Sequence, residues 1–158
     1  MSRIKALQTQ VYAVLEGIGD GDRRAKAVAH LHGVALAAAV LAKKRGQDAE
    51  LATMAGLLHD LYAYKAGSYD DHAHLGAEYA RELLGALALT TEAETDVICS
   101  AIRHHDSKAE VDCPMDEILK DADVLDHSLS DPTKDVKPHE QARYAVLCAE
   151  LGLTNGPV

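Results

Sequence analysis

The segment Leu51-Ala-Thr-Met-Ala-Gly-Leu-Leu-His59-Asp60 ends an almost wholly apolar run with a histidine and an aspartate. The run itself predicts a buried helix. An imidazole and a carboxylate at its end are costly to bury unless a partner neutralises them. Because adjacent polar residues are common in any protein, the pair acquires meaning only together with similar clusters elsewhere in the chain.

Three further clusters of metal-binding side chains lie within apolar segments of helical periodicity. They are His30 with His32, the pair His104-His105, and Asp121 with Asp123. A divalent metal is the simplest single partner for three imidazoles and two carboxylates drawn from such segments. Since cavities between packed helices often hold such sites, the sequence predicts a metal centre between helices.

The composition predicts one all-α domain, residues 1–158, with an aliphatic core. Apolar residues make up 47% of the chain, yet it has no Phe or Trp and is only 4% aromatic. No uninterrupted apolar run approaches the roughly 18 to 20 residues of a membrane helix, and the N-terminus has no signal-peptide core. The cysteines, Cys99, Cys113 and Cys148, form no CxxC motif and indicate free thiols. We therefore expect a cytoplasmic protein without a membrane segment.

The net charge of −9 argues against broad binding to a nucleic-acid backbone, which needs patches of Lys and Arg. A small anionic substrate is compatible with this charge, because a bound metal and a few cations can reverse the sign within a pocket. The sequence does not indicate an oligomeric state.

Helical periodicity dominates the chain, and no segment alternates as a strand does. Asp48 as an N-cap, the spacing of Thr91 and Glu94 in a capping box, and Pro114 at a first helical position mark helix starts. A bundle of about six to seven helices is expected, over about residues 4–17, 20–45, 48–64, 70–84, 91–105, 114–129 and 138–152. The motif-bearing core covers about residues 22–130, a C-terminal helix covers about 138–151, and the tail 154–158 is expected to be frayed.

Taken in order, the motifs resemble those of the HD-domain superfamily of metal-dependent phosphohydrolases, whose signature runs H…HD…D. The matching segments are His30-Leu-His-Gly-Val-Ala35, Ala55-Gly-Leu-Leu-His-Asp60, His72-Ala-His-Leu-Gly-Ala77, Ile102-Arg-His-His105 and Lys120-Asp-Ala-Asp-Val-Leu-Asp126. Each motif is degenerate, but five in the family order, over about residues 22–129, make coincidence a poor explanation.

The resemblance implies that His30, His59, Asp60 and Asp123 hold the catalytic metal. The family's first ligand stands four residues before a Val-Ala pair, which selects His30 over His32. The aspartate of the closing Ala-Asp pair is the family's last ligand, which selects Asp123. Asp60, grouped with His59 as catalytic, would bridge to a second ion and accept a proton from the attacking water.

Relatives with extra histidines between the HD pair and the last aspartate carry a second metal. His72, His104 and His105 are therefore candidates for a second ion or for substrate contact, and one or two ions are both compatible with the sequence. Lys65 and Arg24 are candidate phosphate contacts, although a solvated position suits either equally well. The histidine-rich set favours Mn, Fe, Co, Ni or Zn, with Mg as a further option.

The remaining polar residues near the motifs have structural interpretations. His32 and His74 are expected at the surface or behind a ligand, because each points away from its neighbouring candidate. His127 and His139 are expected as solvated helix residues. Asp126 is expected to accept a hydrogen bond behind a ligand.

Two departures from the family exclude particular branches. Leu61-Tyr-Ala-Tyr-Lys65 is not the Ile-Gly-Lys that follows the HD pair in cyclic-dinucleotide phosphodiesterases, and no Gly-Tyr-Pro follows His105. Hydrolysis of cyclic di-GMP is therefore not expected. The chain is also too short for the synthetase partner of a two-activity alarmone enzyme.

The sequence thus predicts a metal-dependent phosphohydrolase that acts on a small phosphate ester, with a nucleotide as first choice, by metal-activated water. One alternative is a catalytically silent domain that binds metal or regulates. Another is a di-iron HD oxygenase, which His72, His104 and His105 keep open. The sequence names neither the substrate nor the native metal.

Overall fold

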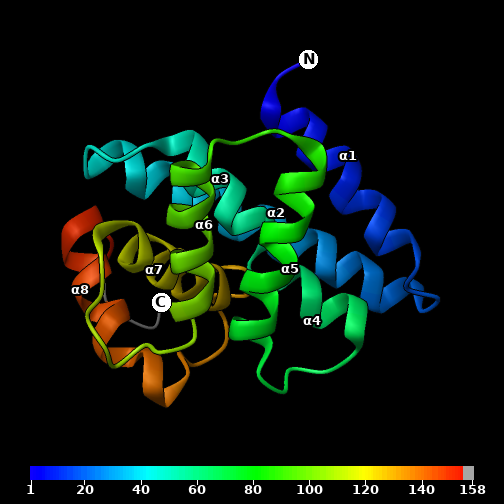
Figure 1. Cartoon of the computed structure of the whole chain (residues 1–158). Coiled ribbons are helices and arrows are strands. Elements are labelled where there is room, and N and C mark those ends of the chain that lie inside the picture. The colour runs from blue at the N-terminus through cyan, green and yellow to red at the C-terminus, as the bar shows by residue number, and fades with distance from the viewer. Residues whose placement is uncertain (155–158) are drawn as a thin grey trace.

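The computed structural model describes residues 1–154, which form eight α-helices and one short 3-10 helix and contain no strand. The all-α class predicted from the sequence is confirmed (Figure 1). The expectation of a frayed tail concerns mainly residues 155–158, which lie outside the described range. The elements are α1 Arg3–Glu16, α2 Gly21–Lys44, α3 Ala49–Leu58, α4 Leu61–Ala66, α5 His72–Leu87, α6 Glu92–His104, α7 Pro114–Leu129, η1 Pro138–Glu140 and α8 Gln141–Leu151.

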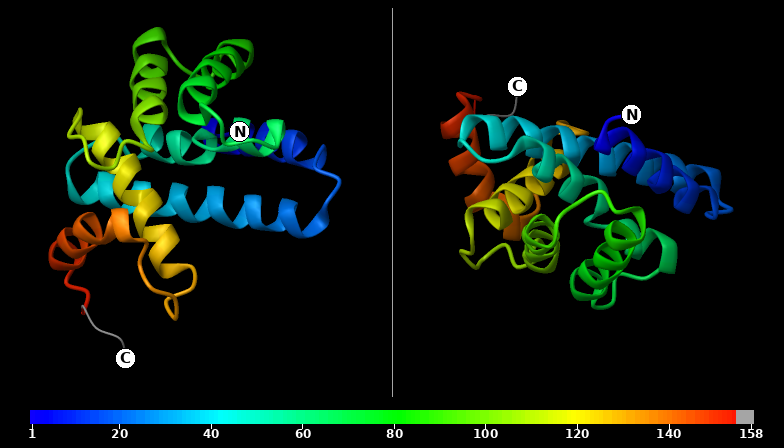
Figure 2. Two further views of the ribbon diagram at one scale, coloured as in Figure 1. Left: turned by 90° about the horizontal axis from the view of Figure 1, so that it is seen from below. Right: turned by 45° about the horizontal axis from the view of Figure 1, so that its top comes forward.

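The long helix α2 organises the fold. It packs most extensively on α3 and α7, and Figure 2 shows it crossing the molecule with α5 and α6 on one side and α8 on the other. The contact with α3 is a close approach of two backbones: a Cβ placed on Gly56 would lie 2.6 Å from Ala35 Cα. Only glycine fits at that position, so Gly56 fixes how near α3, and the HD pair after it, can lie to α2.

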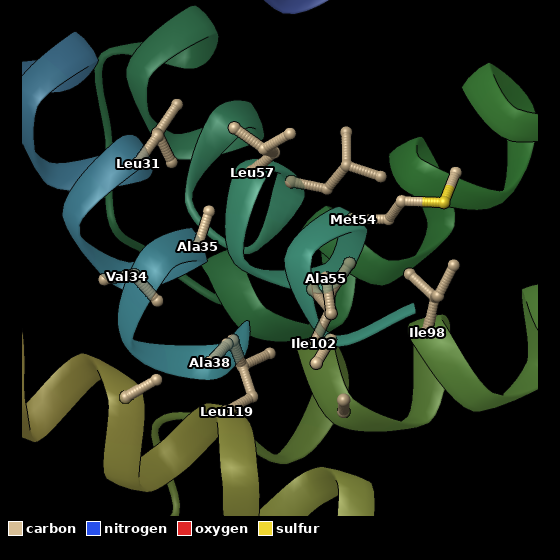
Figure 3. Packing of buried hydrophobic residues seen from close by; sticks show 14 of the residues in the cluster. Leu31, Val34, Ala35, Ala38, Met54, Ala55, Leu57, Ile98, Ile102 and Leu119 are labelled. Atoms are coloured by element: carbon tan, nitrogen blue, oxygen red, sulfur yellow. The ribbon is translucent and has the colours of Figure 1, made fainter. Parts of the chain in front are cut away.

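The core is aliphatic, as the composition predicts. All eight α-helices contribute buried side chains to it, and α4 and α8 contribute the fewest. Figure 3 shows how these side chains pack between α2, α3, α6 and α7. Representative members are Leu31, Val34, Ala38, Met54, Leu57, Ile98, Ile102 and Leu119, each 1% exposed or less. Small residues on α2 let α3 and α7 pack on it closely, and this brings the motif-bearing segments together.

The predicted helix over residues 48–64 is wrong in one respect, because it is broken at His59 and Asp60. Helix α3 ends at Leu58, α4 begins at Leu61, and Asp60 adopts φ −110° and ψ 4° between them. Within one continuous helix, adjacent side chains point about 100° apart. The break releases Asp60 from that constraint, so the histidine and the aspartate can face the same cavity.

By length and composition α2 could also cross a membrane. The core helix of a folded domain meets the same criterion, and α3 and α7 are the helices that pack most extensively on α2. Each remaining predicted helix has a counterpart whose ends differ from the prediction by three residues or fewer. The exception is the last one, whose first turn is the 3-10 helix η1.

Candidate metal centre

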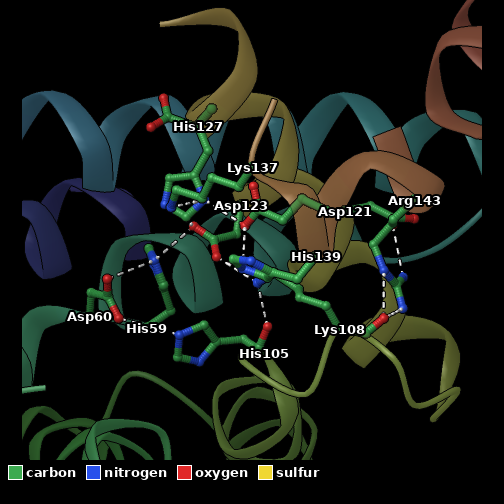
Figure 4. A network of polar contacts seen from close by, with 12 residues as sticks. His59, Asp60, His105, Lys108, Asp121, Asp123, His127, Lys137, His139 and Arg143 are labelled. Carbon is green, nitrogen blue, oxygen red and sulfur yellow. Dashed lines mark hydrogen bonds and ion pairs between the residues drawn. The ribbon is translucent and has the colours of Figure 1, made fainter. Parts of the chain in front are cut away.

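A cavity of about 650 Å³ brings together residues from helices that are far apart in the sequence. His30 comes from α2, Asp60 from the α3–α4 break, His72 from the start of α5, His105 from the end of α6, and Asp123 from α7. Figure 4 shows several of these side chains pointing toward one another. The clusters singled out in the sequence therefore border one space.

A first group of ligand atoms consists of two imidazoles and two carboxylates. His30 Nε2 lies 3.1 Å from His59 Nε2, 3.5 Å from Asp60 Oδ2 and 3.5 Å from Asp123 Oδ1. His59 Nε2 lies 3.6 Å from Asp60 Oδ2 and 3.7 Å from Asp123 Oδ1. Ligands about 2.0–2.2 Å from one ion stand roughly 3.0–3.6 Å apart, so His30, His59 and Asp60 have the spacing of a metal site, and Asp123 lies beside both imidazoles.

A second group uses the other oxygen of Asp60. Its Oδ1 lies 3.3 Å from His105 Nε2 and 3.5 Å from His72 Nε2. The two imidazole nitrogens are themselves 3.3 Å apart. Asp60 thus has one carboxylate oxygen in each group, which is the arrangement needed to bridge two ions.

Hydrogen bonds behind the imidazoles fix which ring nitrogen faces the cavity. Nδ1 of His59 lies 2.8 Å from the Gly56 carbonyl, and Nδ1 of His105 lies 2.7 Å from the Ile102 carbonyl. Nδ1 of His72 likewise lies 2.9 Å from a backbone carbonyl. A carbonyl can only accept, so each Nδ1 donates. In the neutral imidazole each Nε2 then has its lone pair toward the cavity, as metal-ligating histidines require.

His30 is oriented by a carboxylate instead. Its Nδ1 lies 2.7 Å from Asp126 Oδ2, which gives Asp126 the supporting position expected for it. A side chain at Gly33 would collide with that carboxylate, so the glycine on the next turn of α2 leaves room for Asp126.

The two carboxylates show that the residues fit a cation. Asp60 is 7% and Asp123 4% exposed, and Oδ1 of each has no hydrogen-bond partner within residues 1–154. A buried carboxylate oxygen without a donor is costly. Imidazole lone pairs facing such oxygens form a donor set suited to a divalent transition metal.

Electrostatics favour the charged carboxylates. Burial alone would raise the pKa of the Asp60 carboxyl, but the imidazoles of His59 and His105 outweigh it and hold the pKa well below its ordinary value. The pKa of Asp123 is lowered in the same way, because His59 and the Lys108 ammonium outweigh its burial. Both residues are anions ready to bind a cation.

The surplus of negative charge is also visible at His30. Burial lowers the pKa of this imidazole, but Asp126, Asp60 and Asp123 outweigh it and raise the pKa to about 10. A site that attracts a proton this strongly offers the same attraction to a metal ion, which would replace that proton.

Among the cavity residues that the sequence did not indicate as part of the site, two contact Asp123. Lys108 lies in the loop after α6, with Nζ 2.6 Å from Asp123 Oδ2. His127 was expected to be solvated, but its ring stacks on His30 at 5.2 Å and its Nε2 lies 3.4 Å from Asp123 Oδ1. Its spacing of four residues from Asp123 was the available signal, because such residues share one helix face. His139, 67% exposed, lies at the rim.

Three candidate residues do not reach the cavity. His104 turns away, with Nδ1 2.9 Å from Asp116 Oδ2, because it and His105 project in different directions from the end of α6. Lys65 lies over the ring of Tyr79 at 4.4 Å. Arg24 donates to the Ile18 carbonyl. None of the three is among the residues that line the cavity, so its geometry gives no support to the phosphate contacts expected of Lys65 and Arg24.

The histidines expected outside the site do lie outside it. His32 Nε2 is 2.7 Å from the Tyr12 hydroxyl on α1, and His74 contacts Arg103 on the outer side of α5 and α6. Asp121, two residues before Asp123, pairs with Arg45 at 2.7 Å. The structure therefore separates His30 from His32 and Asp123 from Asp121 by position.

Comparisons with known proteins identify the family of this chain. The HD domain family model matches residues 27–128, which include all the cavity ligands described above. The chain is 32% identical over 103 residues to Ribonuclease Y of Chlorobium phaeovibrioides, covering 65% of this chain and 18% of that protein. It is 35% identical over 99 residues to Ribonuclease Y of Aquifex aeolicus, covering 61% of this chain and 16% of that protein. The chain thus spans less than a fifth of these curated relatives.

A solved structure supports the fold. The crystal structure of a predicted HD superfamily hydrolase from an uncultured Thermotogales bacterium aligns with a TM-score of 0.68 and 23% sequence identity, over 96% of this chain and 90% of that one. Because the family model covers well over half of the sequence, the chain belongs to the HD-domain family of metal-dependent hydrolases.

Proposed function

We propose that this protein is a metal-dependent phosphohydrolase acting on a small phosphate ester, with a nucleotide as the first substrate class to test. One observation carries the proposal: two buried carboxylate oxygens, Asp60 Oδ1 and Asp123 Oδ1, have no hydrogen-bond donor in the described part of the chain and face imidazole nitrogens. A purely structural cluster would pair such oxygens with donors.

Two ions can be accommodated by the residues present. His30, His59 and Asp60 would hold the first, with Asp123, which lies beside both imidazoles, as its fourth ligand, and Asp60 with His72 and His105 would hold the second. When bound, such ions polarise a phosphoryl oxygen and lower the pKa of a coordinated water. The histidine-rich donor set favours Mn, Fe, Co, Ni or Zn over Mg.

The chain's own residues would bind and orient the substrate. Asp60, between the two groups, is the carboxylate placed to accept a proton from the attacking water. Lys26, Lys108 and Lys137 line the cavity and supply positive charge for phosphoryl oxygens. Asp126 keeps His30 in its ligating orientation through the 2.7 Å contact with Nδ1.

The walls suit a nucleotide in size and chemistry. A volume of about 650 Å³ lies within the usual range of roughly 300–1,000 Å³ for small-molecule sites. Tyr64 and Tyr69 line the cavity, and aromatic rings stack on bases of any sequence. The curated relatives are ribonucleases by name, which makes an oligoribonucleotide the competing substrate; the net charge of −9 favours the smaller one.

The test begins with metal analysis of protein purified without chelator. Release of phosphate from a panel of nucleoside monophosphates is then compared with cleavage of a short RNA, with Mn, Co, Ni, Zn or Mg added. Phosphate release that disappears in Asp60→Asn supports the proposal. Cleavage of RNA alone would replace the substrate class, and metal-loaded protein inactive on every substrate would favour the silent-domain alternative. Visible absorption from iron together with oxygen consumption would favour the oxygenase.

A further inference from the structure

We infer that Lys108 contacts a phosphoryl oxygen of the substrate and that Arg143, on the C-terminal helix α8, positions it; this inference rests on the function proposed above. Lys108 stands in the loop between α6 and α7. Arg143 lies outside residues 27–128, the part matched by the HD domain family. The pair would extend the active site to a helix beyond that match.

The Lys108 ammonium has one donor to spare at the cavity. Its Nζ lies 2.6 Å from Asp123 Oδ2 and 2.5 Å from the His105 carbonyl. A lysine ammonium has three N–H donors, and no third acceptor lies within hydrogen-bond distance among residues 1–154. The side chain is only 6% exposed, yet it lines the cavity. The remaining N–H is thus available to an acceptor inside the cavity.

Asp123 sets where that acceptor would be. Its Oδ2 binds Lys108, while its Oδ1 faces the imidazoles of His30 and His59 at 3.5 and 3.7 Å. One carboxylate therefore joins the ammonium to the candidate metal group. A phosphoryl group bound at that group would have one oxygen within reach of Lys108, and charge-assisted hydrogen bonds of this kind are the stronger ones.

Arg143 holds the loop that carries Lys108 (Figure 4). Its Nε and Nη2 donate to the Lys108 carbonyl at 3.2 and 2.9 Å, and Nη2 also donates to the Glu110 carbonyl at 3.2 Å. On its other side Nη1 reaches Glu117 at 2.7 Å and Asp121 at 2.9 Å, both on α7. The guanidinium thereby ties the loop backbone to the helix that carries Asp123.

A different role would have different consequences. If Lys108 only neutralised or oriented Asp123, removing it would change metal binding and leave phosphate binding to the ions intact. If it contacts the substrate, phosphate binding should weaken while metal stoichiometry stays constant. Metal content and phosphate affinity therefore separate the two roles without reference to turnover.

The test compares Lys108→Met with wild type and with Lys65→Met, whose lysine lies over Tyr79 outside the cavity. Metal stoichiometry is counted on the Mn-loaded proteins, and inorganic phosphate is then titrated calorimetrically. Lys108→Met should keep the wild-type metal count and bind phosphate about 10- to 100-fold more weakly; Lys65→Met should match wild type. Lys108→Arg keeps the charge without the tetrahedral donor geometry, so its phosphate affinity should lie between those of wild type and Lys108→Met. It replaces Lys108→Met in the test if the methionine variant does not fold.

Arg143→Met should weaken phosphate binding in the same direction, by about 10-fold, as loss of an outer positioning contact does. Arg81→Met is its control, because the ion pairs of Arg81 within residues 1–154 are with the exposed Glu92 and Asp96 alone. If Arg143→Met binds phosphate as tightly as Arg81→Met, Arg143 does not position Lys108.

Phosphate affinity within twofold of wild type in both Lys108 variants overturns the assignment of Lys108, and so does a fall in metal count. Wild-type protein that binds metal but neither binds phosphate nor releases it from any substrate overturns the proposed function itself. The two failures are therefore distinguishable from the wild-type measurement alone.

Discussion

His104 and His105 are neighbours in the sequence but belong to two clusters of opposite character. His105 joins the cavity cluster, in which Asp60 Oδ1 and Asp123 Oδ1 have no hydrogen-bond donor among the described residues. His104 joins what we call the rim cluster, Ser100, His104, Asp112 and Asp116. There Asp116 Oδ2 lies 3.0 Å from the Ser100 hydroxyl and 2.9 Å from His104 Nδ1.

The rim cluster also has ligand atoms close enough to surround an ion, so proximity does not distinguish the two. The two clusters differ in whether their carboxylate oxygens have hydrogen-bond donors or ion-pair partners within the protein. Asp112 Oδ2 already lies 2.5 Å from the Lys120 ammonium, and Asp116 is paired as described. In the cavity cluster the imidazoles instead present Nε2 lone pairs to unpaired carboxylate oxygens. The comparison shows that a buried polar cluster indicates a cation site only where its carboxylate oxygens have no hydrogen-bond donor from the protein itself.

The largest expected effect is the difference between substituting a carboxylate of the cavity cluster and substituting one of the rim cluster. Asp60→Asn should abolish hydrolysis, by at least about 100-fold, and reduce metal content, because Asp60 contributes to both ligand groups. Asp116→Asn should change neither. Metal analysis and phosphate release on both variants check this. Retention of metal and activity in Asp60→Asn, or their loss in Asp116→Asn, would break the comparison.

Substitution of His105 and of His104 in separate variants should change the number of bound ions by one and by none, respectively. His105→Ala should lower the count from about two ions to one, because only His72 and Asp60 would remain in the second group. His104→Ala should leave the count unchanged. Equal counts in both variants, whether one or two, would contradict a second ion held by His105. Lost activity at a constant single ion would then assign His105 to substrate contact.

Removal of metal should destabilise the protein through the cavity cluster. Without a bound ion, the Oδ1 atoms of the buried Asp60 and Asp123, which lack a donor among the described residues, would have no ligand to compensate their burial. Linkage gives a stabilisation of about 3–4 kcal/mol when metal is a few hundred times its dissociation constant. Thermal unfolding with and without chelator measures it. An unchanged melting temperature, with metal loss verified independently, would contradict a buried site.

The fold class and the helices could be predicted from the sequence, because they depend on local signals, and so could the candidate ligands that border the cavity. Caps and apolar periodicity identify helices, and the HD motif order selects His30, His59, Asp60 and Asp123. The break at Asp60 was not predictable, because no Gly or Pro lies between Leu57 and Lys65 to mark it. It arises where α4 packs against α1 and α5, which is a tertiary effect.

The role of Lys108 and the orientation of His104 could not be predicted from the sequence for a related reason. Lys108 stands in a loop without periodicity, and its backbone is held by Arg143, 35 residues away. Which of two adjacent histidines enters a cavity depends on where α6 ends, and helix ends are the least certain part of a prediction. His127 could have been found from its spacing to Asp123.

The smallest expected effect is a loss of unfolding free energy when the rim cluster is changed. The comparison of the two clusters assigns this cluster a structural role. Asp116 is 1% exposed, and Asp116→Ala removes its contacts with Ser100 and His104 at a cost of about 1–3 kcal/mol. The lower part of that range applies if the His104 ring, 38% exposed, turns to water for a new partner. The loss should be the same with and without chelator, since no ion contributes to this cluster. Denaturant unfolding of wild type and Asp116→Ala under both conditions measures it. A loss that depends on chelator would mean that the rim cluster holds or senses the metal, and the distinction between satisfied and unsatisfied carboxylates would fail.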